Sequence, residues 1–118
     1  MSWEHFTATS RGSVTVTDLG SRRRSPAEYA LGTVATGKAR SFHGYRLTIE
    51  HGAKTYVGDS RYSLREAIVD CARKLNAANL SISVASLSES FKETGLSENS
   101  GYGYWDDRKD PVHMMAEV

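Results

Sequence analysis

The chain has 118 residues, of which 39% are hydrophobic and 25% charged, and its formal net charge is +1. This length fits one domain, and the composition excludes collagen-like, low-complexity and highly charged disordered chains. No apolar run approaches the length of about 20 residues that spans a bilayer, and the first residues lack the features of a secretory signal. With a single cysteine, Cys71, we expect a cytoplasmic protein that does not enter a membrane.

Charge is divided unevenly along the chain. Residues 1–88 contain twelve Lys and Arg against seven Asp and Glu, whereas residues 89–118 contain three against seven. The first part is therefore basic and the last part acidic. This asymmetry indicates polar recognition surfaces but does not identify a partner.

The N-terminal third contains one strand pattern and one ambiguous segment. Val14 and Val16 alternate with Ser and Thr, which is the period of a half-buried strand. Ser25–Glu28 is typical of a helix N-terminus, with Ser at the cap and Pro at the first helical position, and Gly32 could end that helix. The competing interpretation is a strand over Tyr29–Thr36. We favour a short helical turn followed by a strand.

The middle of the chain predicts a β-hairpin. Apolar and polar residues alternate over Tyr45–Ile49, and His51–Ala53 is typical of a short turn before a returning strand over Lys54–Val57. Apolar residues alternate with Ser again over Leu80–Ser86. Because these segments alternate rather than run continuously apolar, we expect an antiparallel sheet with one covered face.

The clearest element is a helix over about residues 63–76. Ser63 and Glu66 form a capping-box pattern: the Ser63 hydroxyl accepts from the Glu66 amide, and the Glu66 carboxylate reaches back to the Ser63 amide. Apolar residues at helical spacing form one stripe: Leu64, Ala67, Ile68, Cys71, Ala72 and Leu75. This stripe should cover the sheet, and the expected core is Val14, Val16, Leu47, Ile49, Val57, Leu64, Ile68, Cys71, Leu75, Ile82 and Val84.

Together these elements predict a single α+β domain over residues 1–118. It has an antiparallel sheet of four or five strands, covered on one face by one main helix, plus one or two short helical turns. One such turn is expected over Ser88–Thr94, before Gly95. We also expect a mobile basic loop at about residues 20–25 and an aromatic-acidic segment at about residues 100–115, with the pattern of a terminal hairpin.

The motifs that suggest catalysis or cofactor binding each lack a residue or a spacing that the chemistry requires. Gly32–Ala39 matches a phosphate-binding loop at its glycines and lysine, but Ala39 lacks the hydroxyl that would hold Mg²⁺, and no helix pattern follows. The four histidines have no metal-ligand spacing, and a lone cysteine cannot form a thiolate cage. Cys71 lies on the apolar stripe, where a small buried side chain is expected. We therefore expect a non-catalytic protein with no cofactor and no metal.

Two groups of residues are candidate binding sites. The first is the run Arg22, Arg23 and Arg24, because guanidinium groups suit both phosphate oxygens and carboxylates. The second combines aromatic and acidic residues of the tail: Tyr102, Tyr104, Trp105, Asp106 and Asp107. Tyr and Trp are enriched at protein-binding hot spots, and acidic neighbours suit a basic groove. The simpler alternatives are a solvated loop for the arginines, and a core edge beside an ordinary charged turn for the tail.

The segment from Gly95 to Met115 resembles short accessory proteins of phages and mobile elements. It contains Gly-Leu-Ser-x-x-Ser-Gly-Tyr-Gly-Tyr at residues 95–104 and Pro-Val-His-Met-Met at residues 111–115, about a fifth of the chain. Small α+β proteins of that kind include the anti-CRISPR inhibitors, which this chain resembles in size and in lacking catalytic motifs. The resemblance implies an inhibitor that binds a larger host protein that handles nucleic acid. The alternative is a nucleic-acid-binding protein or small nuclease that uses Arg22–Arg24 and a histidine.

Overall fold

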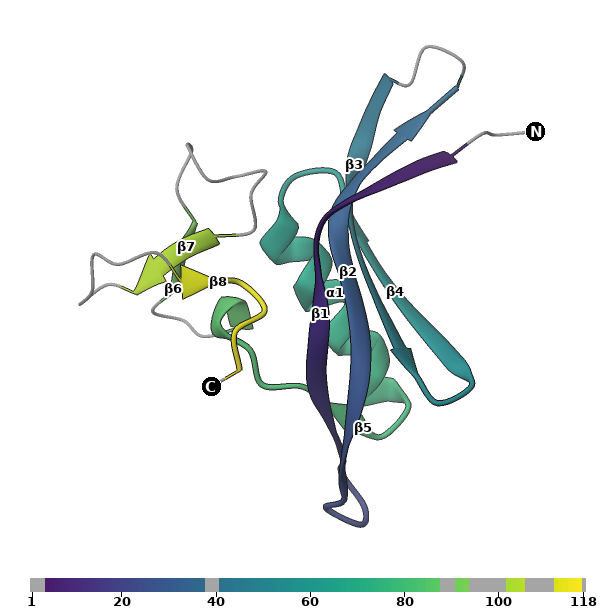
Figure 1. Cartoon of the computed structure of the whole chain (residues 1–118), viewed down its shortest axis with the longest axis vertical. Helices are drawn as coiled ribbons and strands as arrows, with labels where there is room; N and C mark the ends of the chain where they lie inside the picture. The colour runs from purple at the N-terminus through teal and green to yellow at the C-terminus, as the bar shows by residue number, and fades with distance from the viewer. Residues whose placement is uncertain (1–3, 38–40, 88–90, 94–101, 106–111, 118) are drawn as a thin grey trace.

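The computed structural model describes residues 4–37, 41–87, 91–93, 102–105 and 112–117. Its main layer is a five-stranded antiparallel sheet in the order β4-β3-β2-β1-β5 (Figure 1). The strands are β1 (Glu4–Asp18), β2 (Arg24–Thr36), β3 (Ser41–His51), β4 (Lys54–Ser60) and β5 (Leu80–Ser81). One helix, α1 (Leu64–Ala77), packs against β3 and β4, which confirms the α+β architecture and the helix-covered antiparallel sheet expected from the sequence.

The core lies between α1 and one face of the sheet. Side chains alternate between the two faces along each strand, so every second residue points toward the helix. Val14 of β1, Leu31 of β2 and Leu47 of β3 meet Ile68 and Leu75 of α1 there, and all are fully or almost fully buried. Ten of the eleven expected core residues are buried; the exception is Val57. Burial of this apolar surface is the main force that holds the helix on the sheet.

Val57 was wrongly assigned to the core. It pairs with Thr48, which lies on the opposite face of the sheet from Leu47 and Ile49, and it is half-buried. Its neighbour Gly58 faces α1 instead, and a Cβ at Gly58 would collide with the helix backbone at Ala67 and Cys71. A glycine at this position therefore lets the helix approach the strand closely.

The N-terminus of α1 forms half of the expected capping box. Ser63 has extended backbone angles, and its hydroxyl accepts from the Glu66 amide at 3.0 Å, as predicted. The Glu66 carboxylate does not reach back to Ser63 but accepts from the hydroxyl of Ser60 at 2.8 Å. Ser60 in turn accepts from the Tyr62 amide at 3.0 Å, so the end of β4 and the start of α1 share one hydrogen-bond network.

The helical turn expected at Ser25–Glu28 is wrong, because this segment opens the strand β2. Pro26 is tolerated there. It pairs with Thr15, whose amide points away from β2 to the Glu117 carboxylate, and the β2–β3 ladder begins only at Glu28. The missing amide of Pro26 therefore costs no ladder hydrogen bond. Ala27 is buried on the helix side, so the strand gains core contacts that a helical turn would lose.

The sheet is strongly twisted. Figure 1 shows β1 at one side of β2 in its lower half and at the other side in its upper half. The register shifts between Ala8 and Ser10 in β1 and again between Val34 and Ala35 in β2. Such bulges add local bending and twist to a strand pair. As a result, the upper part of β1 turns away from the C-terminal elements.

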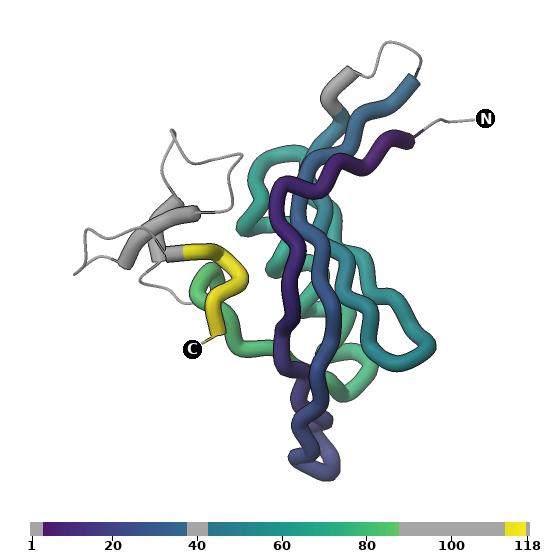
Figure 2. The backbone as a smooth tube through the Cα atoms, viewed as in Figure 1, coloured from purple at the N-terminus to yellow at the C-terminus, as the bar shows by residue number. Residues whose placement is uncertain are grey.

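The C-terminal part of the chain forms a smaller sheet and then returns to the core. Its strands are β6 (Phe91–Glu93), β7 (Tyr102–Trp105) and β8 (Val112–His113), and β7 pairs antiparallel with β8, as the hairpin pattern predicts. The helix expected over Ser88–Thr94 is wrong at Phe91–Glu93, and the rest of that segment lies outside the described residues. Met114 and Met115 are buried and belong to the main core. Figure 2 shows the end of the chain, in yellow, running back beside η1 (Ala85–Leu87).

The strand expected over Leu80–Ser86 is also only partly right. β5 ends at Ser81, Val84 forms a single bridge to Glu117, and η1 begins at Ala85. The amide of Ala85 donates to the carbonyl of Ala116 at 2.8 Å. The returning C-terminus thus takes hydrogen bonds that a longer β5 would have given to β1.

Candidate binding surfaces

The three arginines lie at the turn between β1 and β2, which we call the arginine hairpin (residues 18–25). The Asp18 carboxylate accepts from the amides of Gly20 and Ser21, both at 2.9 Å. The Asp18 amide donates to the Arg23 carbonyl at 2.8 Å, and the Arg22 amide returns to the Asp18 carbonyl at the same distance. Arg22 itself has a φ of 62°, in the left-handed region. The basic segment is therefore a hydrogen-bonded turn.

Two further features stabilise this turn: the ionised Asp18 carboxylate and a hydrogen bond to the end of the helix. Hydrogen bonds from the amides of Ser21 and Gly20 hold the pKa of the Asp18 carboxyl below its usual value, so that it is ionised at neutral pH. The Leu19 amide donates to the carbonyl of Asn79, just after α1, at 2.9 Å. The tip of the hairpin is thus tied to the end of the helix as well as to its own strands.

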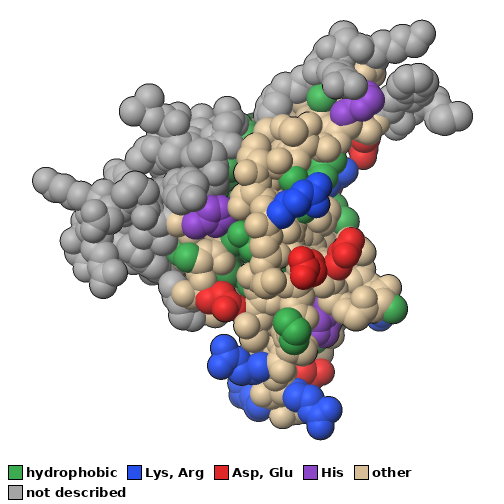
Figure 3. All heavy atoms as spheres, in the orientation of Figure 1, with side chains coloured by type: hydrophobic (Ala, Val, Ile, Leu, Met, Phe, Trp, Pro, Cys, Tyr) green, Lys and Arg blue, Asp and Glu red, His purple; other side chains and the backbone are tan. Residues whose placement is uncertain are grey.

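The guanidinium groups of Arg22, Arg23 and Arg24 project into solvent. All three side chains are exposed, and none forms an ion pair or hydrogen bond with a described residue. Figure 3 shows Lys and Arg side chains gathered over this end of the molecule. Arg24 has a small electrostatic effect on Glu117. The pKa of the Glu117 carboxyl is lowered chiefly by the hydrogen bond from the Thr15 amide and to a smaller extent by the charge of Arg24.

Leu19 adds an apolar element to the same tip. Its side chain is 37% exposed, although large aliphatic side chains are usually buried. Behind it, Ser25 contacts His51 with Oγ and Nε2 2.7 Å apart, so the β3–β4 turn supports the base of the hairpin. Arginine is among the residue types enriched at protein-binding surfaces, and here three exposed arginines lie beside this leucine.

The structure places only part of the second candidate surface. Tyr102, Tyr104 and Trp105 belong to β7, with Tyr104 opposite Lys92 and Trp105 opposite Phe91 of β6. The side-chain positions of these aromatics, and Asp106 and Asp107 entirely, lie outside the described residues. The sequence prediction of a tail binding surface therefore stays a prediction, and the arginines are not brought into contact with it by any described interaction.

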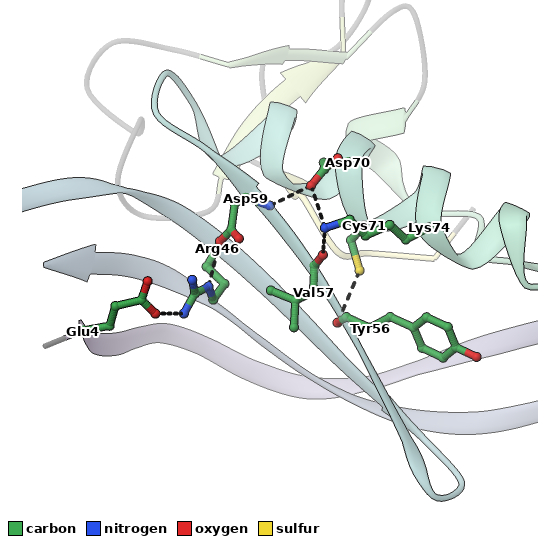
Figure 4. Close-up of polar contacts among 8 residues, drawn as sticks. All are labelled: Glu4, Arg46, Tyr56, Val57, Asp59, Asp70, Cys71 and Lys74. Atoms are coloured by element: carbon green, nitrogen blue, oxygen red, sulfur yellow. Dashed lines mark hydrogen bonds and ion pairs between the residues drawn. The ribbon is translucent and has the colours of Figure 1, made fainter. Parts of the chain in front are cut away.

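Sequence reasoning missed a third feature, an ion-pair cluster at the upper end of the sheet (Figure 4). Arg46 donates to Asp59 through Nε at 2.7 Å and to Glu4 through Nη1 at 3.2 Å. These hydrogen bonds, Asp59 first, raise the pKa of Arg46, so it stays charged. The cluster borders a hollow of about 300 Å³ that His43 and Arg61 also line. Only the pairing of β1 to β3 across β2 brings these residues together.

A second hollow, of about 410 Å³, lies between the end of β4 and α1. Tyr62 and Val69, 77% and 39% exposed, line it together with Arg61 and Arg73. The Asp70 carboxylate, on the wall of this hollow, already has partners within the chain: it accepts from the Asp59 amide at 3.0 Å and pairs with Lys74 at 3.3 Å. The sequence gives one signal for this surface, since Val69 lies off the apolar stripe of the helix.

The residues that the sequence analysis considered for catalysis or metal binding are placed as follows. Burial raises the pKa of the Cys71 thiol to about 12, so the reactive thiolate is not populated, and Cys71 is buried as expected. No group of three His, Cys, Asp or Glu in the described part of the chain is placed to hold a metal ion. The glycine-lysine stretch begins inside β2, with Gly37 in the turn after it, which is not the strand–loop–helix arrangement of a phosphate-binding loop.

No described helix is long and apolar enough to cross a membrane. Comparison of the chain with protein-family models, curated proteins and solved structures found no match. Among the described surfaces, the arginine hairpin has the clearest set of exposed side chains without a partner in the described part of the chain.

Proposed function

We propose that this protein is a non-catalytic binding module that docks onto an acidic surface of a larger partner protein through the arginine hairpin. One observation carries the proposal: Arg22, Arg23 and Arg24 are held exposed on one hydrogen-bonded turn, and no described residue pairs with them. Carboxylates on a partner would supply the bidentate hydrogen bonds that these guanidinium groups do not make within the chain.

The fixed turn favours tight association. Immobilising a flexible loop on binding costs conformational entropy, and a turn that is already ordered avoids most of that cost. Asp18 fixes the backbone of the turn, and the Leu19–Asn79 hydrogen bond fixes its direction. Only the arginine side chains remain to be ordered when the partner binds.

A protein partner fits this surface better than a nucleic-acid backbone. The exposed Leu19 can bury apolar area against a protein, whereas a phosphate backbone offers no apolar contact of that kind. Glu28 and Glu50 are exposed and stand opposite each other in the β2–β3 ladder, so the basic charge does not continue along β2. The net charge of +1 also lacks the basic excess of a dedicated nucleic-acid binder.

The resemblance to anti-CRISPR inhibitors extends this proposal to the partner's identity. On that view the partner is a host protein that handles nucleic acid, and the chain acts by covering one of its surfaces. The tail segment with Tyr102, Tyr104 and Trp105 would form a second contact with the same partner. Small size and composition support this extension.

The test compares two variants that lose the same charge. The first carries Arg22→Ala, Arg23→Ala and Arg24→Ala; the second carries Arg11→Ala, Arg61→Ala and Arg73→Ala, three exposed arginines elsewhere. Each tagged protein is used to capture partners from nuclease-treated host extract, read by quantitative mass spectrometry. We expect the first variant to lose a specific partner at least about tenfold, as removing hot-spot arginines does, and the second to retain it.

Direct binding of nucleic acid would overturn this proposal. Purified protein is titrated with single- and double-stranded DNA and RNA at several salt concentrations. A phosphate binder would show log K falling with log salt by about 0.9 per duplex phosphate neutralised, and would lose that slope in the hairpin variant. We expect no binding at physiological salt. Cleavage of the same substrates would replace the proposal with the nuclease alternative.

A further inference from the structure

The first strand of the sheet has an outer edge that is mostly unpaired. On the side away from β2, β1 pairs with β5 only at Thr17 and Asp18. Within the described residues, no backbone hydrogen bond is made on this side anywhere between Glu4 and Ser13. A row of unpaired amides and carbonyls of this length is a template for another strand.

The geometry of β1 shows which residues point their backbone groups outward. The Thr7 carbonyl lies against Gly32 of β2, where a Cβ would collide with it, so the backbone groups of Thr7 face inward. Inward and outward positions alternate in an antiparallel pair, which turns the backbone groups of Glu4, Phe6 and Ala8 outward. These three lie in the upper part of β1, which turns away from the C-terminal elements (Figure 1).

The opposite edge of the sheet, β4, is covered by side chains of α1, unlike the upper edge of β1. On β4, the Asp59 amide donates to the Asp70 carboxylate of α1 at 3.0 Å, and the Val57 carbonyl accepts from the Lys74 ammonium at 2.6 Å (Figure 4). Charged side chains that cover edge groups in this way prevent strand addition. The upper part of β1 has no such cover among the described residues, and Phe6–Ser10 contains neither a charged residue nor a proline.

We propose that the upper edge of β1 pairs antiparallel with the same edge of a second copy of this chain, around a two-fold axis at Phe6. The outward residues Glu4, Phe6 and Ala8 are spaced symmetrically about Phe6. A two-fold axis there places residues with outward backbone amides and carbonyls opposite one another in the two strands. Glu4 lies opposite Ala8 of the second copy, and Phe6 lies opposite Phe6.

The side chains favour this register. Phe6 is half-buried, and two copies of it at the axis form a cross-strand aromatic pair. Glu4, already paired with Arg46 of its own chain, faces a small apolar Ala8 rather than a second carboxylate. The result is one continuous sheet through both copies. This inference goes beyond the proposed function and does not rest on it, because the arginine hairpin lies at the other end of β1.

Sedimentation over a wide concentration range tests the dimer. We expect wild-type protein to shift from monomer to dimer as concentration rises. Ala8→Pro removes one outward amide without removing a β1–β2 hydrogen bond, and should leave the protein monomeric. Ala8→Thr keeps that amide and should still dimerise, so it is the matched control. Circular dichroism checks that each variant retains the helix signal.

A crosslinking measurement covers the case in which Ala8→Pro fails to fold. Directly opposite residues in a ladder lie within disulfide reach, so Phe6→Cys should give a covalent dimer on mild oxidation. His5→Cys, which this register does not place opposite itself, should not, and the buried Cys71 keeps wild-type protein uncrosslinked. A wild-type protein that is monomeric throughout, a dimer insensitive to Ala8→Pro, or equal crosslinking at both positions overturns the proposal. A monomer that adds only a foreign strand also overturns it.

Discussion

The contact between His113 and Ser10 joins the C-terminal segment to the first strand of the sheet. His113 Nε2 and Ser10 Oγ are 2.7 Å apart, and the Met115 amide donates to Nδ1 at 3.0 Å. Because Nδ1 accepts, the neutral ring must carry its proton on Nε2 and donate it to Ser10. Protonation of Nδ1 would remove the acceptor for Met115. The turn that positions the buried methionines therefore requires a neutral imidazole.

This arrangement predicts a pH dependence of stability. Burial lowers the pKa of His113 below its usual 6.5, so the unfolded chain binds this proton at a higher pH than the folded one does. The free energy of unfolding should therefore be highest above about pH 7 and fall as the pH drops through 6.5 and below. Denaturant melts between pH 8 and pH 5 measure it.

The matched variant for this measurement is His113→Gln, which keeps a polar side chain but cannot titrate. Its stability should vary less with pH over the same range than that of wild-type protein. The other three histidines are present in both proteins, so the difference between the two profiles isolates His113. If the free energy of unfolding varies with pH equally in the two proteins, the fold does not depend on a neutral His113 imidazole.

At the scale of single residues, sequence patterns were informative only where the interaction is local. The Ser63 cap was predictable because both partners lie within three residues. The Glu66 carboxylate went to Ser60 instead, and nothing in the local sequence shows that the end of β4 reaches the helix N-terminus. Arg22–Arg24 stood out as a charge run, but the hydrogen bond from the Leu19 amide to the Asn79 carbonyl joins residues far apart in the chain and leaves no local signal.

The helix α1 is held to the sheet by its apolar stripe, and its adjacent residues allow a controlled test. Ile68 is fully buried, whereas Val69 is 39% exposed on the same turn. Ile68→Asp would bury an unpaired charge and should destabilise the fold by about 4 kcal/mol or more, a large part of the total stability of a domain of this size. Val69→Asp should change stability by about 0.5 kcal/mol at most. Equal melting curves by circular dichroism for the two variants would contradict the placement of the stripe.

Asp70 links the helix to the edge strand and contributes a second pH dependence. The Asp59 amide, and then Lys74, hold the pKa of the Asp70 carboxyl below its usual 3.8. Its contribution to stability is therefore present above that value and is lost as the pH falls through the lower folded pKa. Asp70→Asn should be less stable than wild-type protein at pH 7, and the two should converge in acid. A constant difference down to pH 2 would show that the charge is irrelevant.

At the element scale, α1 could be predicted because its cap, stripe and termination signals all lie within one short segment. The strand over Tyr29–Thr36 could also be predicted, but the start of β2 could not, because Ser25–Glu28 satisfies a helix-start pattern while the same residues pair with β1. Apolar residues at positions 27 and 31 suit either structure. Pairing of this segment with β1 decided the outcome, and such long-range pairing leaves no local signal.

For the molecule as a whole, the end of the chain is part of the core. Met114 and Met115 are 0% and 3% exposed within the same cluster as α1 and the sheet. The carbonyl of Met114 accepts from the Ser86 amide at 3.1 Å, and the Glu117 carboxylate accepts from the Thr15 amide. The main sheet and helix thus enclose a core that the last residues complete.

A chain truncated after Pro111 tests this directly. Deleting one buried methionine side chain to Ala costs about 2–5 kcal/mol, so losing two together with their backbone hydrogen bonds should abolish cooperative folding. Met114→Ala alone should lower the melting temperature but leave a folded protein, because the backbone of the segment is retained. Glu117→Gln, which keeps an acceptor for Thr15, should stay close to wild type. If the truncated chain melts cooperatively at the wild-type temperature, the C-terminal segment is an appendage that the core does not need.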